Sequence, residues 1–310
     1  MHDAANNPIV SIVLATFNGE RYLKEQLDSV FQQTYCNLEI IAVDDSSSDN
    51  TVSILREYAL SHCNLKVYVN DKNIGHIKTF EKGITLSTGD FIALCDQDDI
   101  WDKQKIELLM QKINDYGMVF CDSAFIDEAG KSLNKKISDI KNLSTYNNCI
   151  PFIMENCISG HAALMKREIA IAAIPFPKDI IHDWWLAFVA STKGAVYFVD
   201  QPLVKYRQHT GNFIGGIKVE GRIKKKYTQI ELINKVRNRI RCFYEKCPES
   251  NTKAKEILRK FNKSYQSFSI QNNFSRMSIF HKYKSELLAI KKRTAFRKWL
   301  FCFKMFVKLR

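Results

Sequence analysis

The 310-residue sequence predicts an α/β fold, with a mostly parallel central sheet flanked by helices and a basic α-helical C-terminal region. Two observations lead to this prediction. Apolar runs typical of buried strands alternate with helical periods over the first half of the chain, and the character then changes to long basic segments. We therefore expect a first domain at residues 1–216 and a basic helical region at residues 217–310.

The elements of the first half follow in order. Strands are expected at residues 9–17, 38–43, 65–69 and 91–95, because each is a short and nearly continuous apolar run. Residues 20–33 and the segment after residue 50 place apolar side chains at helical spacing, and Asp49 or Asn50 is the expected N-cap of the second helix. This alternation predicts parallel strands, whose carboxyl ends form the ligand-binding edge of such sheets.

Acidic residues come directly after two of these strands. Asp44 and Asp45 follow the second strand, and Asp96-Gln97-Asp98-Asp99 follows the fourth. Three carboxylates in four residues repel one another unless a cation or solvent screens them, and their oxygens suit Mg²⁺ or Mn²⁺. On spacing alone, a solvated acidic turn is an equal alternative.

Other features exclude several classes of protein. Nine cysteines without a CxxC pair indicate reduced thiols rather than a zinc site or a disulfide framework. The N-terminal residues carry no apolar stretch, so no secretory signal is expected, and no apolar run is long enough to span a membrane. GxGxxG and GxxxxGK[ST] motifs are absent, which argues against dinucleotide and P-loop enzymes. We expect a cytoplasmic protein.

Ordered motifs over residues 9–106 resemble those of family 2 inverting glycosyltransferases, which have the GT-A fold. Residues 11–18 (SIVLATFN) are similar to that family's first strand, and residues 38–51 (LEIIAVDDSSSDNT) to its second strand and nucleotide-binding turn. Residues 73–75, 88–92 and 96–106 match in order and spacing, the last as the Asp-x-Asp segment. A weaker resemblance continues to about residue 211 through HDWW at residues 182–185 and YRQH at residues 206–209.

The resemblance implies a donor site and a metal site. A nucleotide-sugar donor is expected against Ala15, Thr16 and Phe17, with Asp45 accepting a hydrogen bond from the nucleotide base. Gln97 belongs to the same donor set. Lys78 is assigned there too, although a solvated surface lysine explains it equally well.

The metal is expected to be Mg²⁺ or Mn²⁺. Asp98 resembles the direct ligand, Asp96 is expected near the ribose or the metal, and His209 resembles a position near the metal or the diphosphate. For His209 a structural role is the alternative.

Inversion requires a base that takes the proton of the acceptor hydroxyl, and Asp183 resembles that base. A helix N-cap before WWLAFVA is the structural alternative, and the two roles are compatible. Gly160, His182 and Trp184 are expected on the acceptor side. Lys103 and His182 depart from the family pattern, where many members have proline and glutamate.

The basic region suggests an anionic partner. Residues 217–310 hold 26 Lys and Arg against 6 Asp and Glu, a net charge of +20, and residues 295–310 mix five of these cations with aromatic side chains. Such a segment suits an anionic membrane surface, whereas packing on the first domain is the alternative. A nucleic-acid-binding protein is the competing class, but no zinc-finger or RNP-like signature supports nucleic acid as a partner.

Together these features predict an inverting, metal-dependent enzyme, peripheral on the inner face of the cytoplasmic membrane. The segments DQDDIW and YRQH most resemble bacterial rhamnosyltransferases that use a dTDP-rhamnose donor. The expected acceptor is a glycan or lipid-linked hydroxyl in O-antigen or capsule-type polysaccharide synthesis. A glucosyl, galactosyl or N-acetylhexosaminyl transferase that uses a UDP-sugar is the alternative enzyme.

Overall fold

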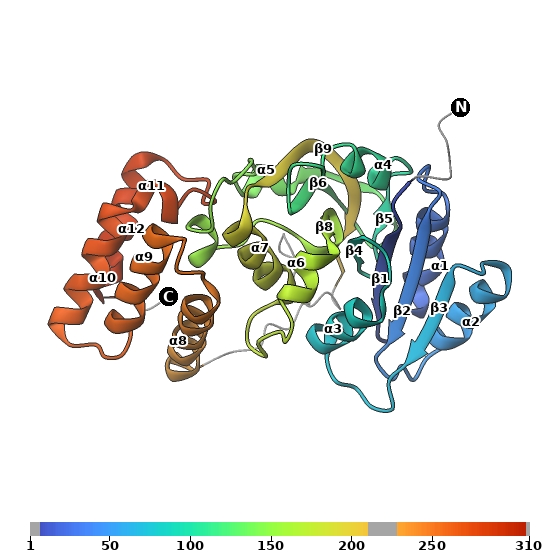
Figure 1. The fold of residues 1–310 in the computed structure, drawn as a ribbon, viewed down its shortest axis with the longest axis horizontal. Coiled ribbons are helices and arrows are strands. Elements are labelled where there is room, and N and C mark those ends of the chain that lie inside the picture. The colour runs from blue at the N-terminus through green and yellow to red at the C-terminus, as the bar shows by residue number, and fades with distance from the viewer. Residues whose placement is uncertain (1–6, 210–227, 308–310) are drawn as a thin grey trace.

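The computed structural model describes residues 7–209 and 228–307. The first half alternates strands and helices as expected (Figure 1). Its elements are β1 (Val10–Thr16), α1 (Glu20–Phe31), β2 (Leu38–Asp44), α2 (Thr51–Ser61), β3 (Leu65–Val69), α3 (His76–Leu86), β4 (Phe91–Cys95), β5 (Ile100–Trp101) and α4 (Lys105–Met110). Asn50 occupies the N-cap position of α2 without a side-chain bond, while Asp49 accepts a bond from the Thr51 backbone N–H.

Residues 118–207 complete the sheet. Their elements are β6 (Met118–Ile126), β7 (Ser132–Lys136), α5 (Ile137–Ile140), the 3₁₀ turns η2 (Pro151–Ile153) and η3 (Gly160–Ala162), β8 (Ala163–Lys166), α6 (Arg167–Ala172), α7 (His182–Lys193) and β9 (Val196–Arg207). Within the described residues one sheet runs in the order β3-β2-β1-β4-β8-β6-β9-β5, with β7 on β6. Strands β3, β2, β1 and β4 are parallel, as are β6 and β9, and β8 is antiparallel to β4 and β6.

The register of the parallel strands brings the predicted site segments together. Thr16 at the end of β1 lies opposite Asp44 at the end of β2, and Leu14 lies opposite Cys95 at the end of β4. The residues that follow these strands therefore share one edge of the sheet. This is the edge at which open α/β sheets bind ligands.

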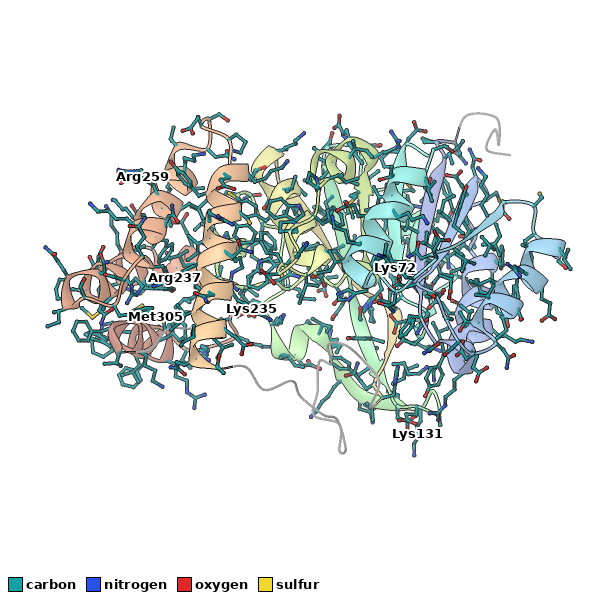
Figure 2. The ribbon with its side chains drawn as sticks, turned by 90° about the horizontal axis from the view of Figure 1, so that it is seen from below. Lys72, Lys131, Lys235, Arg237, Arg259 and Met305 are labelled. Atoms are coloured by element: carbon teal, nitrogen blue, oxygen red, sulfur yellow. The ribbon has the colours of Figure 1, made fainter. Side chains whose placement is uncertain are left out.

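The C-terminal region is helical and packs on the first domain. It contains α8 (Gln229–Lys246), α9 (Thr252–Ser264), α10 (Ile270–Lys282), α11 (Lys284–Leu287) and α12 (Ala295–Val307). Phe243 of α8 is fully buried and stacks on Phe188 of α7, with 4.0 Å between ring centroids. One hydrophobic cluster runs from Phe120 in the sheet to Met305 in α12, a residue that Figure 2 labels.

Two further expectations concern the chain as a whole. All nine cysteines are free thiols, as predicted. No helix in the described part of the chain is long and apolar enough to cross a bilayer. The expected boundary at residue 216 falls within residues 210–227, outside the described residues.

Candidate active site

A cleft of about 730 Å³ opens at the carboxyl ends of β1 and β4. It is lined by the residue after β1, the segment after β4, the first turn of α7 and the end of β9. The predicted site residues that line it are Ala15, Thr16, Phe17, Asp45, Asp96, Gln97, Asp98, Gly160, His182, Asp183, Trp184 and His209. Lys78 is not among the lining residues, and its ammonium group pairs with Glu81 on α3 at 2.7 Å.

One end of the cleft carries an exposed aromatic ring. Phe17 is 46% exposed directly after β1, although a phenyl ring gains by burial. Asp45 is buried at the same end and holds the loop that precedes α3. Its carboxylate accepts hydrogen bonds from the Asn70 side chain at 2.9 Å and from the Ile74 and Gly75 backbone N–H groups at 2.8 Å. Asp45 thus shapes the wall beside Phe17.

Gln97 joins the acidic segment to the end of β1. Its amide accepts a bond from the Phe17 N–H at 2.8 Å and donates to the Phe17 carbonyl at 3.1 Å. A Cβ at Gly19 would lie 2.2 Å from Gln97 Oε1, so only glycine leaves room for this contact. These two hydrogen bonds of the Gln97 side chain therefore fix the position of the Phe17 backbone.

Asp98 and His209 lie together in the cleft although 111 positions separate them in the chain. His209 Nε2 is 2.8 Å from Asp98 Oδ2, and the two side chains are 16% and 14% exposed. Burial raises the pKa of Asp98 to about 6, against the opposing effect of His209. A buried carboxylate of this kind gains from a bound cation.

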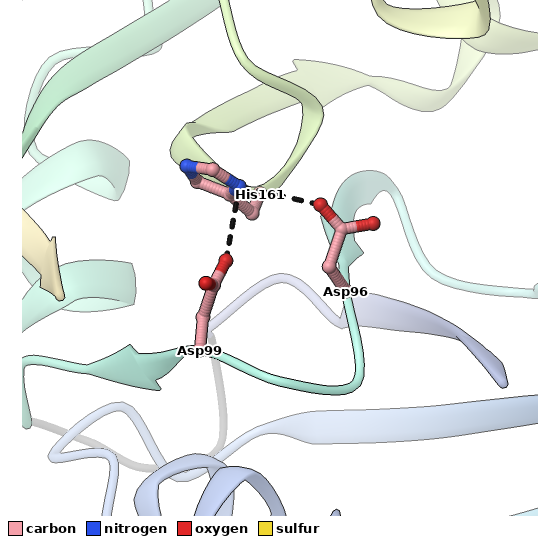
Figure 3. Close-up of side chains that lie close together, drawn as sticks. All are labelled: Asp96, Asp99 and His161. Carbon is pink, nitrogen blue, oxygen red and sulfur yellow. Dashed lines mark hydrogen bonds and ion pairs between the residues drawn. The ribbon is translucent and has the colours of Figure 1, made fainter. Parts of the chain in front are cut away.

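Asp96 pairs with a histidine that the sequence did not single out (Figure 3). His161 Nδ1 lies 3.3 Å from Asp96 Oδ2 and 3.0 Å from Asp99 Oδ2, while Nε2 lies 3.1 Å from Ser123 Oγ. Burial would lower the pKa of His161, but the Asp99 and Asp96 carboxylates outweigh it and raise the pKa to about 10. His161 is therefore an imidazolium that ties the two carboxylates together. Its position inside the NCISGHAALMKR segment was the available signal.

Within the described residues, one group of three side chains brings its ligand atoms close enough for a divalent cation. Asp96, Asp99 and His161 bring their ligand atoms within 4.8 Å of one another. Asp99, however, is fully buried and does not line the cleft, and His161 as an imidazolium has no free nitrogen lone pair for a metal. The predicted group of Asp98, Asp96 and His209 lines the cleft, but its three ligand atoms do not all lie within 4.8 Å of one another. Carboxylate oxygens with an imidazole nitrogen suit Mn²⁺ at least as well as Mg²⁺.

Two buried cationic side chains hold the acidic segment and its neighbour His161 in place on the side away from the cleft. Lys105 is fully buried, donates to the His161 carbonyl at 2.5 Å and lies 3.0 Å from the centre of the Trp101 ring. Arg207, at the end of β9, donates to the Asp98 carbonyl at 2.9 Å, and its backbone N–H donates to Asp99 at 3.0 Å. These contacts hold the acidic turn in one conformation.

Asp183 lies in the first turn of α7, directly after His182, and Ile181 is the N-cap residue. Asp183 is half-buried in the cleft, and Asn156 Nδ2 donates to its Oδ1 at 3.1 Å. Burial raises the pKa of the Asp183 carboxyl to about 6. A carboxylate with this raised pKa has a proton affinity suited to a general base.

The remaining predicted residues form the wall beside Asp183. His182 is buried and neutral, since burial lowers its pKa to about 3. A Cβ at Gly160 would lie 3.0 Å from His182 Nε2, so glycine permits this approach. Trp184 donates from Nε1 to the Phe152 carbonyl at 2.6 Å, and the Arg239 guanidinium of α8 covers its ring at 4.4 Å. The helical region therefore reaches the wall of the cleft.

Sequence comparison relates the chain to known glycosyltransferases. Residues 11–172 match the model of glycosyl transferase family 2. The dTDP-rhamnosyl transferase RfbG of Shigella flexneri is 31% identical over 235 residues, which cover 71% of this chain and 78% of the relative. A putative glycosyltransferase of Bacillus subtilis, EpsH, is 29% identical and aligns over 67% of this chain and 63% of its own.

Solved structures show the same fold at low sequence identity. S. aureus TarS in complex with UDP-GlcNAc has a TM-score of 0.60 at 16% identity, over 90% of this chain and 81% of that one. The mannosyltransferase PcManGT of Pyrobaculum calidifontis, in complex with GDP-Man and Mn²⁺, has a TM-score of 0.53 at 16% identity, over 98% and 86%. The fold is GT-A, and the chain belongs to glycosyl transferase family 2.

Proposed function

We propose that the chain is an inverting, metal-dependent rhamnosyltransferase that moves rhamnose from dTDP-rhamnose to a hydroxyl of a glycan or lipid-linked acceptor. The single observation that carries the reaction type is one cleft that holds an aromatic wall, an acidic pair and Asp183. The likeness to RfbG, named a dTDP-rhamnosyl transferase, supports the choice of sugar.

The donor would lie along the edge of the sheet. Phe17 would stack on the nucleotide base, and the loop that Asp45 holds would close the base site from one side. The diphosphate would face Asp96 and Asp98. A divalent cation held by Asp98, Asp96 and His209 would neutralise the charge that develops on the leaving diphosphate.

Asp183 would act on the acceptor. As a carboxylate it would accept the proton of the acceptor hydroxyl while that oxygen attacks the anomeric carbon from the face opposite the diphosphate. Asn156 would hold the carboxylate in place through its 3.1 Å bond. A single displacement of this kind inverts the anomeric configuration.

A panel of nucleotide sugars tests the proposal. The purified chain should turn over dTDP-rhamnose faster than UDP-glucose, UDP-galactose or UDP-N-acetylglucosamine, and chelation of divalent cations should abolish turnover. Asp98→Asn should lose the metal-dependent turnover. Full activity of that variant, or full activity in excess chelator, would contradict the metal assignment. Faster turnover of a UDP-sugar would contradict the assignment of dTDP-rhamnose as the donor. Retention of the anomeric configuration in the product would exclude a single displacement.

We also propose that the enzyme works in the cytoplasm, at the inner face of the membrane. Helix α12 packs with Cys302 and Met305 buried, yet it leaves an aromatic row exposed. Phe296 is 67%, Trp299 is 39% and Phe303 is 42% exposed, and neighbouring rings contact one another. An aromatic row on a cationic helix suits the anionic headgroup region.

A further inference from the structure

Two basic segments that are far apart in the sequence meet beside the cleft. Residues 135–141 belong to the first domain, and residues 291–298 lead into α12. Lys141 and Lys291 form a β-bridge, and the Asn142 N–H donates to the Ile290 carbonyl at 2.9 Å. Lys292 donates to the Ser138 carbonyl at 2.9 Å. We call these two segments the basic strap, which joins the C-terminal helices to the region around α5 (Figure 1).

The basic strap borders the part of the cleft that lies beyond Asp183. Lys141, Ile140 and Glu155 line this part of the cleft. Glu155 pairs with both Lys141, at 4.0 Å, and Lys291. One carboxylate thus lies between two ammonium groups at the cleft wall.

Most of the positive charge of the strap has no internal acidic partner. The strap contains eight basic residues and one acidic residue, Asp139. Within the described parts of the chain no ion pair to a carboxylate is found for five of its cations, which are Lys135, Lys292, Arg293, Arg297 and Lys298. All but Lys298 of these five are exposed. A concentrated positive surface of this kind binds multivalent anions, phosphate above all.

The neighbouring surface indicates which phosphate compound fits. Phe296 lies within the strap, and the exposed aromatic row of α12 continues from it through Trp299 and Phe303. In an acceptor that carries a diphosphate on a lipid chain, the diphosphate would contact the cations and the lipid chain would contact the apolar rings. A nucleic acid duplex would use the cations alone, because its bases are already stacked on one another.

We propose that the basic strap binds the diphosphate of a lipid-linked acceptor and thereby directs the acceptor's sugar towards Asp183. The proposal rests on the proposed function and names the acceptor class for the same cleft. It makes the helical region a part of the acceptor site rather than a support alone.

Binding of geranyl diphosphate in EDTA, measured by isothermal titration calorimetry, tests the proposal without turnover. The strap variant carries Lys135→Glu, Arg293→Glu and Arg297→Glu, three exposed positions. The matched control carries Arg56→Glu, Lys112→Glu and Arg259→Glu, which are exposed and outside the cleft, and Figure 2 labels Arg259 in the helical region. Both variants change the net charge equally. The strap variant should bind at least about tenfold more weakly than the wild type, and the control within about twofold.

Further ligands separate the remaining outcomes. Inorganic pyrophosphate should bind more weakly than geranyl diphosphate. Equal affinities would contradict the proposal that the surface also binds the lipid chain. Equal losses in both variants would overturn the strap as a site. If the wild type bound a 20-nucleotide single strand more tightly than geranyl diphosphate, and this binding were lost in the strap variant but kept in the control, the surface would be assigned to nucleic acid instead. Binding of dTDP with Mn²⁺, measured on the same proteins, reports on the donor site alone. Its failure would contradict the proposed function, whereas failure of geranyl diphosphate binding would contradict only the strap.

Discussion

At the scale of single residues, the cleft keeps ionisable groups in environments that oppose their ordinary charge. Burial raises the pKa values of Asp98 and Asp183 to about 6 and lowers that of His182 to about 3. His161 is the opposite case, because two carboxylates hold its proton. Groups with such shifts concentrate where chemistry takes place.

Asp183→Asn is expected to lose at least about a hundredfold in turnover, because the amide cannot accept the acceptor proton. Asp71→Asn, at an exposed position outside the cleft, is the control. Wild-type turnover should fall as the pH drops below about 6, where Asp183 becomes protonated. A profile of kcat against pH that is flat from 5 to 8 would point to another base.

Asp183→Asn should also change the pH dependence of the free energy of unfolding. The pKa of Asp183 rises from 3.8 to about 6 in the folded protein, so the folded state favours the protonated form. Stability is therefore lost as the pH rises from about 4 to 6, and the loss persists above pH 6. Asp183→Asn should be more stable than the wild type at pH 8, by about 1–2 kcal/mol after allowance for partial exposure, and similar at pH 4. A collapsed melting temperature at pH 8 would instead make Asp183 structural.

At the scale of elements, the site depends on contacts between the ends of strands. Gln97 makes two hydrogen bonds to the Phe17 backbone, so the turn after β4 fixes the end of β1. Arg207 does the same from β9 to the acidic turn. Each contact joins segments that only the sheet order makes neighbours.

Gly19→Ala should raise the KM for the donor by about three- to tenfold, because the new Cβ would displace the Gln97 amide and break two hydrogen bonds. The φ of Gly19 is −107°, which alanine adopts freely, so the melting temperature should change little. Gly194→Ala is the control, since no atom lies within 4 Å of the place that its new Cβ would take. An unchanged KM in Gly19→Ala would mean that Gln97 does not shape the donor site.

At the scale of the whole molecule, the helical region is both packed and exposed. Phe243 and Met305 are buried against neighbouring elements, whereas α12 turns an aromatic row outward. The two alternatives for the basic region, packing and surface binding, are therefore compatible. One face of α12 packs on the protein, and its other face is exposed and available for binding.

Trp299→Ala with Phe303→Ala should weaken sedimentation with phosphatidylglycerol liposomes while the melting temperature is kept, because both rings are exposed. Met305→Ala is the contrasting variant. It should lower the free energy of unfolding by about 2–5 kcal/mol, since the side chain is 2% exposed. Salt should weaken wild-type binding without abolishing it, as the apolar part is not screened. Undiminished sedimentation of the double variant would contradict the membrane proposal.

The sequence by itself determined four strands, β1 to β4, their order along the chain and the placement of the acidic residues after two of them, whereas β5 to β9 were not predicted from periodicity. These features follow from local periodicity, and β3 and β4 have the predicted bounds. The family motifs also marked twelve of the residues that line the cleft. Such information lies within short windows of the chain, where apolar spacing and turn residues are sufficient to reveal it.

Only the tertiary structure decided which distant groups meet. His161 lies 65 positions from Asp96, Lys105 lies 56 from His161, and Arg207 lies 109 from Asp98. None of these partners can be deduced from periodicity, because such long-range contacts depend on the order of the strands and not on neighbouring residues. The basic strap has the same origin, since its two halves are about 150 residues apart and meet through the bridge between Lys141 and Lys291 and the bond from Lys292 to the Ser138 carbonyl.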